Sequence, residues 1–314
     1  MKHRVLITCP NLINTIDHYR DFFASHDIDI MIPDFVQQLS EAQLLNLIGE
    51  FDGVIAGDDP FTERVFEKAT RLKVMAKWGV GVDSIDLEAA KRLKIPVFNT
   101  PGAFSDEVAD VAMGYVILLA RQLHRIDRTV RQGKWEKPLG TSLRGKRLGI
   151  IGVGGIGQAI TQRCVAAGMV PLGYDVRDIP DGFRQQTGMQ QLALNDLFSQ
   201  ADFIVLSCNL TSENYHLLDD SAFEKMHDGV YIVNVSRGPL IDEVSLLKYL
   251  GTKKVAGAAM DVFEHEPLSP QSDLHLFENC IFGSHNSSNT REAVMRVNDW
   301  TIQNLLRGLN GEVP

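Results

Sequence analysis

The chain has 314 residues, 44% hydrophobic and 23% charged, which is the composition of a globular protein long enough for two domains. Its formal net charge of −9 argues against nucleic acid, or an anionic membrane surface, as the main partner. The cysteines Cys9, Cys164, Cys208 and Cys280 show neither metal-type nor disulfide-type spacing, which indicates reduced thiols and a cytoplasmic location. Residues 1–10 predict a strand and not the apolar region of a signal peptide.

Short strand-like runs alternate with helical patterns over the first hundred residues. The expected strands are residues 4–9, 28–33, 53–57, 73–78 and 96–100. Residues 40–50, with Ser40 as N-cap, and residues 86–93 are expected to be helices. This alternation predicts a parallel sheet covered by helices. The apolar helix expected at 108–121 is interrupted by Asp110 and is shorter than the roughly 20 residues of a membrane span.

A second series of strands starts near Lys146 and ends before a long helix at 290–309. Its expected strands are residues 147–152, 170–175, 203–208, 230–236, 255–262 and 280–285. The first of them leads into Gly152, Gly154 and Gly157, which have the spacing G-x-G-x-x-G, and a helical pattern follows. Strand, glycine turn and helix in this order predict a dinucleotide site.

Each of these glycines has a separate physical task in such a site. The first permits a tight turn, the second lets the backbone approach a pyrophosphate, and the third lets the helix pack on the strand. The helix N-terminus then holds the phosphate charge. Asp175 ends the next expected strand, where its carboxylate can bind ribose hydroxyls and repel a 2′-phosphate, although an aspartate there can also simply cap a turn. The series predicts NAD as cofactor.

Polar side chains follow three expected strands of the second series. They are Arg237 after one strand, Asp261, Glu264, His265 and Glu266 after another, and His285 after a third. An arginine suits a carboxylate or a polarised carbonyl. A histidine exchanges a proton near neutral pH, and an adjacent carboxylate orients it and favours its protonated form. Beside a nicotinamide, such residues suffice for hydride transfer to or from a hydroxy acid.

Over nearly its whole length the chain resembles the D-isomer-specific 2-hydroxyacid dehydrogenases, particularly the phosphoglycerate dehydrogenase branch. The segments that carry the resemblance are residues 79–102, 108–121, 143–157, 209–218, 231–243, 258–268 and 284–290. The resemblance implies two doubly wound α/β domains with parallel sheets. A flavodoxin-like substrate domain would comprise residues 1–102 plus 287–314, and a Rossmann NAD-binding domain residues 103–286. It also implies a homodimer, with the active site between the two domains.

The resemblance further assigns roles to single residues. It places the catalytic arginine at Arg237, the glutamate at Glu266 and the acid/base histidine at His285. The implied cofactor-binding residues are Gly152, Gly154, Gly155, Ile156, Gly157, Asp175, Thr211 and Asp261, the last contacting the nicotinamide carboxamide. The implied substrate-binding residues are Val80 and Gly81, through their amides, and Arg237. No metal ligands are expected, His265 is expected to be a loop residue, and His124, His216 and His227 are expected at the surface.

Two departures from the family pattern leave the substrate open. Lys77-Trp78-Gly79 stands where many relatives have Arg-Ala-Gly, and Ser287-Ser288 replaces two glycines. Lysine keeps the positive charge but loses the bidentate fork, so Lys77 is a candidate for binding a substrate phosphate, and Trp78 is expected to crowd the pocket or stack. 3-Phosphoglycerate is the leading candidate substrate. A glyoxylate/hydroxypyruvate or other 2-ketoacid reductase, and a non-catalytic NAD(H)-sensing interaction protein, are the alternatives.

Overall fold

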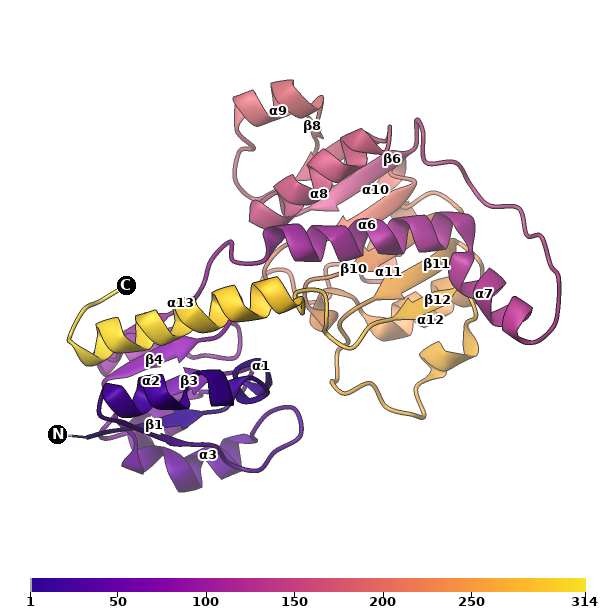
Figure 1. Ribbon diagram of the computed structural model, residues 1–314. Helices are drawn as coiled ribbons and strands as arrows, with labels where there is room; N and C mark the ends of the chain where they lie inside the picture. The colour runs from indigo at the N-terminus through magenta and orange to yellow at the C-terminus, as the bar shows by residue number, and fades with distance from the viewer. Residues whose placement is uncertain (1) are drawn as a thin grey trace. The chain divides into compact units, whose positions relative to one another are not determined.

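The computed structural model describes residues 2–314, and these form two compact units (Figure 1). One unit comprises the chain up to Ala103 together with Thr290–Pro314, and the other is Phe104–Asn289. The domain boundaries expected from the sequence, 102/103 and 286/287, lie within a few residues of these limits. Each unit contains its own parallel sheet.

The sheet of the first unit has five parallel strands in the order β2-β1-β3-β4-β5. The strands are β1 (His3–Ile7), β2 (Ile28–Met31), β3 (Gly53–Ala56), β4 (Val74–Lys77) and β5 (Val97–Phe98). β3 and β4 are buried along their whole length, as the near-continuous apolar runs of a parallel sheet require. The five strands predicted from the sequence are therefore confirmed.

Helices cover this sheet. They are α1 (Pro10–Ile13), α2 (Arg20–Ser25), α3 (Glu41–Leu47), α4 (Glu63–Lys68), α5 (Leu87–Arg92) and α13 (Arg291–Leu309). α13, from the far end of the chain, packs on β3 and β4. The predicted N-cap of α3 is confirmed, because the Gln43 amide donates to Ser40 Oγ at 3.4 Å and the Gln43 side chain accepts from the Ser40 amide at 2.9 Å.

The sheet of the second unit has seven parallel strands in the order β12-β11-β10-β9-β6-β7-β8. The strands are β6 (Arg147–Ile151), β7 (Val170–Tyr174), β8 (Gln190–Gln191), β9 (Phe203–Leu206), β10 (Val230–Asn234), β11 (Val255–Met260) and β12 (Cys280–Phe282). The chain order reverses between β6 and β9. In an open parallel sheet, ligands bind beyond the carboxyl ends of the strands at such a switch point. The glycine turn that follows β6 therefore lies at the expected ligand position.

The helices of the second unit are α6 (Ser105–Arg121), α7 (Leu123–Arg131), α8 (Gly155–Ala166), α9 (Asp181–Thr187), α10 (Leu194–Gln200), α11 (Asp220–Lys225) and α12 (Glu243–Gly251). α6 packs on α8 and on strands β10 and β11 (Figure 1). Asp110, which interrupts the apolar pattern of α6, accepts a hydrogen bond at 2.6 Å from Arg163 Nε of α8. Across residues 2–314, no helix combines the length and apolar character that a membrane crossing requires.

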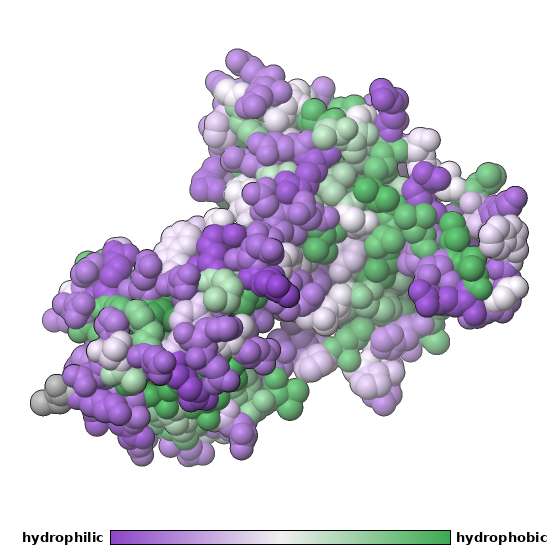
Figure 2. All heavy atoms as spheres, in the orientation of Figure 1, coloured by the Kyte–Doolittle hydropathy of each residue, from purple (hydrophilic) through white to green (hydrophobic). Residues whose placement is uncertain are grey.

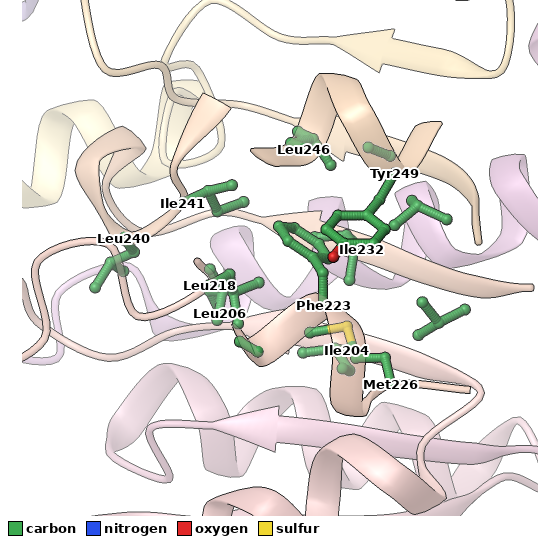
Figure 3. Close-up of a cluster of buried hydrophobic side chains, with 14 of the residues drawn as sticks. Ile204, Leu206, Leu218, Phe223, Met226, Ile232, Leu240, Ile241, Leu246 and Tyr249 are labelled. Carbon is green, nitrogen blue, oxygen red and sulfur yellow. The ribbon is translucent and has the colours of Figure 1, made fainter. Parts of the chain in front are cut away.

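The core of the second unit holds β9 and β10 against α11 and α12 (Figure 3). Phe223 of α11 and Tyr249 of α12 pack with their ring centroids 5.2 Å apart. Ile204 of β9 and Ile232 of β10 are fully buried in the same cluster. Burial stabilises the fold by about 1.5–3 kcal/mol for each such side chain. This packing fixes the strands whose carboxyl ends carry the polar residues described next.

Candidate active site

The glycines after β6 occupy three different environments, which correspond to their three expected tasks. Gly152 has φ +91°, and a Cβ there would lie 2.5 Å from the backbone of Cys208. A Cβ at Gly157 would overlap the carbonyl oxygen of Gly152. A Cβ at Gly154, by contrast, would meet nothing within 4 Å. The first glycine thus permits the turn, the third permits the approach of helix and strand, and the second keeps a space open.

That open space lies at the N-terminus of α8. Gly154 is the N-cap of this helix, and Gly155 and Ile156 form its first turn. Backbone N–H groups at the start of a helix have no partner within the helix and carry partial positive charge. A pyrophosphate fits this environment, since no side chain fills the space above Gly154.

Asp175, the expected ribose ligand, follows β7 and forms a hydrogen bond with the glycine turn. Its Oδ2 accepts a hydrogen bond at 2.8 Å from the amide of Val153, between Gly152 and Gly154. Its Oδ1 accepts from the amide of Arg177 at 3.0 Å, so Asp175 also caps the following turn. The Arg177 guanidinium is 3.5 Å from the carboxylate and mostly exposed. Thr211 lies in the exposed segment after β9.

His285 and Glu266 form a hydrogen-bonded pair. His285 Nδ1 lies 2.8 Å from Glu266 Oε2, and Glu266 Oε1 accepts from the amide of Phe263 at 3.0 Å. The loops after β11 and β12 bring the two residues together because these strands are neighbours in the sheet. Since the carboxylate holds Nδ1, Nε2 is the ring nitrogen suited to exchange a proton with a reactant. Both side chains are partly exposed, at 28% and 24%.

Arg237 is held in the loop after β10 by a buried asparagine. The Asn234 side chain donates to the Arg237 carbonyl oxygen at 2.8 Å and accepts from the amide of Ser236 at 3.0 Å. Gly238 packs so closely on the backbone of Phe263 that a Cβ at 238 would overlap it. Because Phe263 also binds Glu266, the loop of Arg237 adjoins the loop of the His285–Glu266 pair. The structure thus brings the three expected catalytic residues to one edge of the second sheet.

The expected substrate residues Lys77, Val80 and Gly81 belong to the first unit. Lys77 ends β4, is only 3% exposed, and its Nζ donates to the carbonyl oxygen of Trp78 at 2.8 Å. The same ammonium lies 3.1 Å from Asp58 Oδ1, which neutralises its charge. Lys77 is therefore a buried, paired cation. Trp78 is likewise buried in the first unit.

The Trp78 indole donates at 2.8 Å to Asn298 Oδ1 of α13, so this ring contributes to the packing of the first unit. The next loop residues are bound by the two residues that follow β5. The carbonyl oxygen of Val80 accepts from the Asn99 side chain at 2.8 Å, and that of Gly79 accepts from the Thr100 amide at 3.0 Å.

His216, expected at the surface, is partly exposed, at 31%, and contacts an acidic side chain. Its Nε2 is 2.8 Å from Glu264 Oε1, and the same oxygen accepts a hydrogen bond from the amide of Glu243 at 3.2 Å. Burial, and then the charge of Glu264, raise the pKa of Glu243. The ligand atoms of His216, Asp242 and Glu264 lie within 4.8 Å of one another, a metal-type cluster that sequence spacing did not predict. Asp242 also caps α12, so these groups fix the loop that carries Glu266.

Sequence reasoning also missed Asn234 and the contacts of Ser287. The sequence signal for Asn234 was a polar residue at the end of an apolar strand, shortly before the expected Arg237. Ser287 is buried and contacts Asp261, which is itself only 2% exposed. Its sequence position showed only that a glycine had been replaced.

The chain is similar to known proteins in both sequence and fold. Residues 113–287 match the family described as "D-isomer specific 2-hydroxyacid dehydrogenase, NAD binding domain". Over 262 residues the chain is 36% identical to a glyoxylate reductase of Korarchaeum cryptofilum, covering 82% of this chain and 79% of the relative. It is 36% identical to a hydroxypyruvate reductase of Thermotoga maritima, covering 87% of this chain and 90% of the relative.

A human D-3-phosphoglycerate dehydrogenase is 37% identical over 83% of this chain, but the match covers only 49% of that relative. Among solved structures, a glyoxylate reductase from Paecilomyes thermophila superimposes with a TM-score of 0.88 at 26% identity. That match covers 100% of this chain and 97% of the other. The chain therefore belongs to the D-isomer-specific 2-hydroxyacid dehydrogenase family and is an oxidoreductase that uses NAD as its cofactor.

Proposed function

We propose that this enzyme reduces a small unphosphorylated 2-keto acid, of the glyoxylate or hydroxypyruvate type, with NADH. The observation that carries the proposal is the environment of Lys77. A phosphorylated substrate needs a separate cation for its phosphate, and Lys77, the candidate identified from the sequence, is buried and neutralised by Asp58. The names of the relatives matched over most of their length support the same substrate class. 3-Phosphoglycerate, favoured from the sequence, becomes the weaker candidate.

In this proposal the glycine turn and the N-terminus of α8 hold the pyrophosphate, and Asp175 binds the adenosine ribose. NADH, when bound, supplies the hydride. His285 donates a proton from Nε2 to the substrate carbonyl oxygen while Glu266 orients the ring and favours its protonated form. Arg237 binds the substrate carboxylate and polarises the carbonyl. The amides of Val80 and Gly81 are proposed to bind the same carboxylate.

Steady-state kinetics with a panel of 2-keto acids test the proposal. NADH oxidation is measured with glyoxylate, hydroxypyruvate and 3-phosphohydroxypyruvate, with His285→Ala as the inactive control. We expect kcat/KM for glyoxylate or hydroxypyruvate to exceed that for 3-phosphohydroxypyruvate by at least roughly tenfold, since a phosphate without a cation loses about one charge-assisted hydrogen bond. A higher kcat/KM for the phosphorylated compound overturns the substrate assignment. Tight NADH binding without turnover of any 2-keto acid supports the NAD(H)-sensing alternative.

We also propose that the enzyme is a homodimer joined through α6, α7 and the segment that follows them. Apolar side chains gather on this part of the second unit (Figure 2). Those exposed are Ile117, Leu123, Val130, Trp135 and Leu139, the last two by 80% and 94%. An exposed apolar surface of this kind is typical of an interface. Light scattering should give the mass of a dimer for the wild type and of a monomer for Leu139→Asp. Leu276→Asp, which changes an exposed leucine elsewhere, should remain dimeric. A monomeric wild type contradicts the proposal.

A further inference from the structure

Asp261, at the carboxyl end of β11, accepts the amides of three consecutive residues in the loop after β12. Its carbonyl oxygen accepts from the His285 amide at 2.7 Å, its Oδ1 from the Asn286 amide at 3.2 Å, and its Oδ2 from the Ser287 amide at 2.9 Å. His285 has φ +55°, a left-handed conformation that is unfavourable for a residue with a Cβ. The contacts to Asp261 therefore hold the proposed acid in a backbone conformation that it would not adopt alone.

The side chain of Ser287 adds a further donor to the same carboxylate. Ser287 is 5% exposed, and its hydroxyl donates to Asp261 Oδ2, the oxygen that also accepts the Ser287 amide. On the other side of the carboxylate, Tyr115 Oη of α6 lies 3.4 Å from Oδ1. Gly283 packs directly against the carboxylate, because a Cβ at this position would overlap Oδ1. Ser287 thus donates two hydrogen bonds to Oδ2, one from its amide and one from its hydroxyl. Together they prevent rotation of the enclosed carboxylate.

We propose that Ser287 is a positioning residue for His285, acting through Asp261. Its hydroxyl fixes the Asp261 carboxylate, and the fixed carboxylate holds the backbone from 285 to 287 so that the ring remains on Glu266. Relatives with glycine at this position, as the sequence pattern indicates, would rely on the backbone amides alone. The proposal concerns how the loop is held, and only its kinetic part rests on the proposed function.

Hydrogen exchange of the protein without cofactor or substrate tests the structural part. The Ser287→Ala variant loses one charge-assisted hydrogen bond, so amides in the peptide 283–289 should exchange roughly tenfold or more faster than in the wild type. Peptides of the glycine turn, residues 152–157, should exchange as before. Ser288→Ala is the matched control, because it removes a hydroxyl from the adjacent residue, whereas the hydroxyl that donates to Asp261 belongs to Ser287. Unchanged exchange in Ser287→Ala overturns the proposal, whether or not the enzyme reduces a 2-keto acid.

Kinetics then distinguish positioning from simple stabilisation. With the 2-keto acid for which the wild type has the highest kcat/KM, Ser287→Ala should lower kcat roughly tenfold. Its Kd for NADH should stay within about twofold of the wild-type value, and each chain should still bind one NADH. In a double-mutant cycle, adding Ser287→Ala to Asp261→Asn should cost no further activity, since the Ser287 hydroxyl acts through the Asp261 carboxylate, which the asparagine variant lacks. Ser287→Gly provides the same comparison if the alanine variant fails to fold. Faster exchange with unchanged kcat, or multiplicative effects in the cycle, overturns the positioning role.

Discussion

Two alanine substitutions in the glycine turn should have opposite consequences, although they lie three residues apart. Gly154→Ala adds a methyl group to an empty space at the N-terminus of α8, where the backbone is already extended at φ −74°. Gly157→Ala adds the same group where it overlaps the carbonyl oxygen of Gly152. We therefore expect Gly154→Ala to fold normally and bind NADH poorly, and Gly157→Ala to lose stability.

The structure sets the size of both effects. For Gly154→Ala, exchange of one N-cap residue should change the free energy of unfolding by less than about 1 kcal/mol. A methyl group where the pyrophosphate should lie removes at least one charge-assisted hydrogen bond, which raises the NADH Kd roughly 10- to 100-fold. For Gly157→Ala, the overlap is with backbone, so α8 must move away from β6. Overpacking of this kind costs about 1–3 kcal/mol, a fall of several degrees in Tm.

Thermal unfolding without cofactor, followed by fluorescence titration with NADH, measures both quantities on the same samples. Gly182→Ala is a suitable control, because a Cβ there also meets nothing within 4 Å and the residue lies in α9, outside the glycine turn. If Gly154→Ala binds NADH like the wild type, the pyrophosphate does not lie above Gly154 and the cofactor assignment of this turn is refuted. A Gly157→Ala variant with wild-type Tm would refute the packing argument.

Five further substitutions have outcomes that follow from the described contacts. Asp175→Ala should lower kcat/KM with NADH roughly tenfold and lower that with NADPH by less, which narrows the preference for NAD(H). His285→Ala should lower kcat by about 10²–10⁴-fold with little change in NADH affinity, and Glu266→Gln should lower kcat less because the amide still orients the ring. Lys77→Met should lower Tm and reduce kcat/KM equally for phosphorylated and unphosphorylated substrates, since this lysine is buried and paired. Burial would raise the pKa of Asp52, but hydrogen bonds from the Arg4 amide and the Arg71 side chain outweigh burial, and the pKa is lowered. The ionised carboxylate therefore stabilises the fold above about pH 4, and this contribution is lost as the pH falls through the lowered pKa. Urea unfolding of Asp52→Asn should show a deficit at pH 7 that shrinks toward pH 3.

Each of these outcomes has a result that contradicts it. Equal kcat/KM with NADH and NADPH in the wild type would remove the ribose role of Asp175. A His265→Ala variant as impaired as His285→Ala would mean that the acid has been misplaced. A loss confined to the phosphorylated substrate in Lys77→Met would restore the phosphate role of that lysine. A deficit in Asp52→Asn that does not depend on pH would show that the effect comes from packing and not from charge.

The strands of both sheets were predictable because their residues form apolar runs bounded by polar ones. β8 was missed because its two residues, Gln190 and Gln191, carry no apolar signal. β10 ends at Asn234, before the expected end at residue 236, because the Asn234 side chain bonds to the backbone of the following turn. The glycine turn was predictable for a different reason, since its geometry depends on neighbours within one local segment.

The environments of Lys77 and His216 could not be predicted from local sequence. Lys77 becomes buried because Asp58, in the loop after the neighbouring strand β3, comes within 3.1 Å of it. His216 contacts Glu264, which lies far along the chain in the loop after β11. The first pairing joins the ends of the neighbouring strands β3 and β4, and the second joins the segments after β9 and β11, which lie on either side of β10. A charge at the end of a strand does not by itself reveal its partner.

The bond between Asp175 and Val153 has a consequence for redesign of the cofactor site. The carboxylate that should discriminate against a 2′-phosphate also holds the amide of the glycine turn, so one side chain carries two tasks. Replacing it with a small neutral residue to admit NADP(H) would release the turn as well, and affinity for both dinucleotides would fall. A successful switch therefore requires a second substitution that supplies a new acceptor for the Val153 amide. Variants at position 175 alone should accept NADP(H) more readily relative to NAD(H), but with lower catalytic efficiency. Selection for NADP(H) use should recover a change at position 175 together with a second change that binds the Val153 amide.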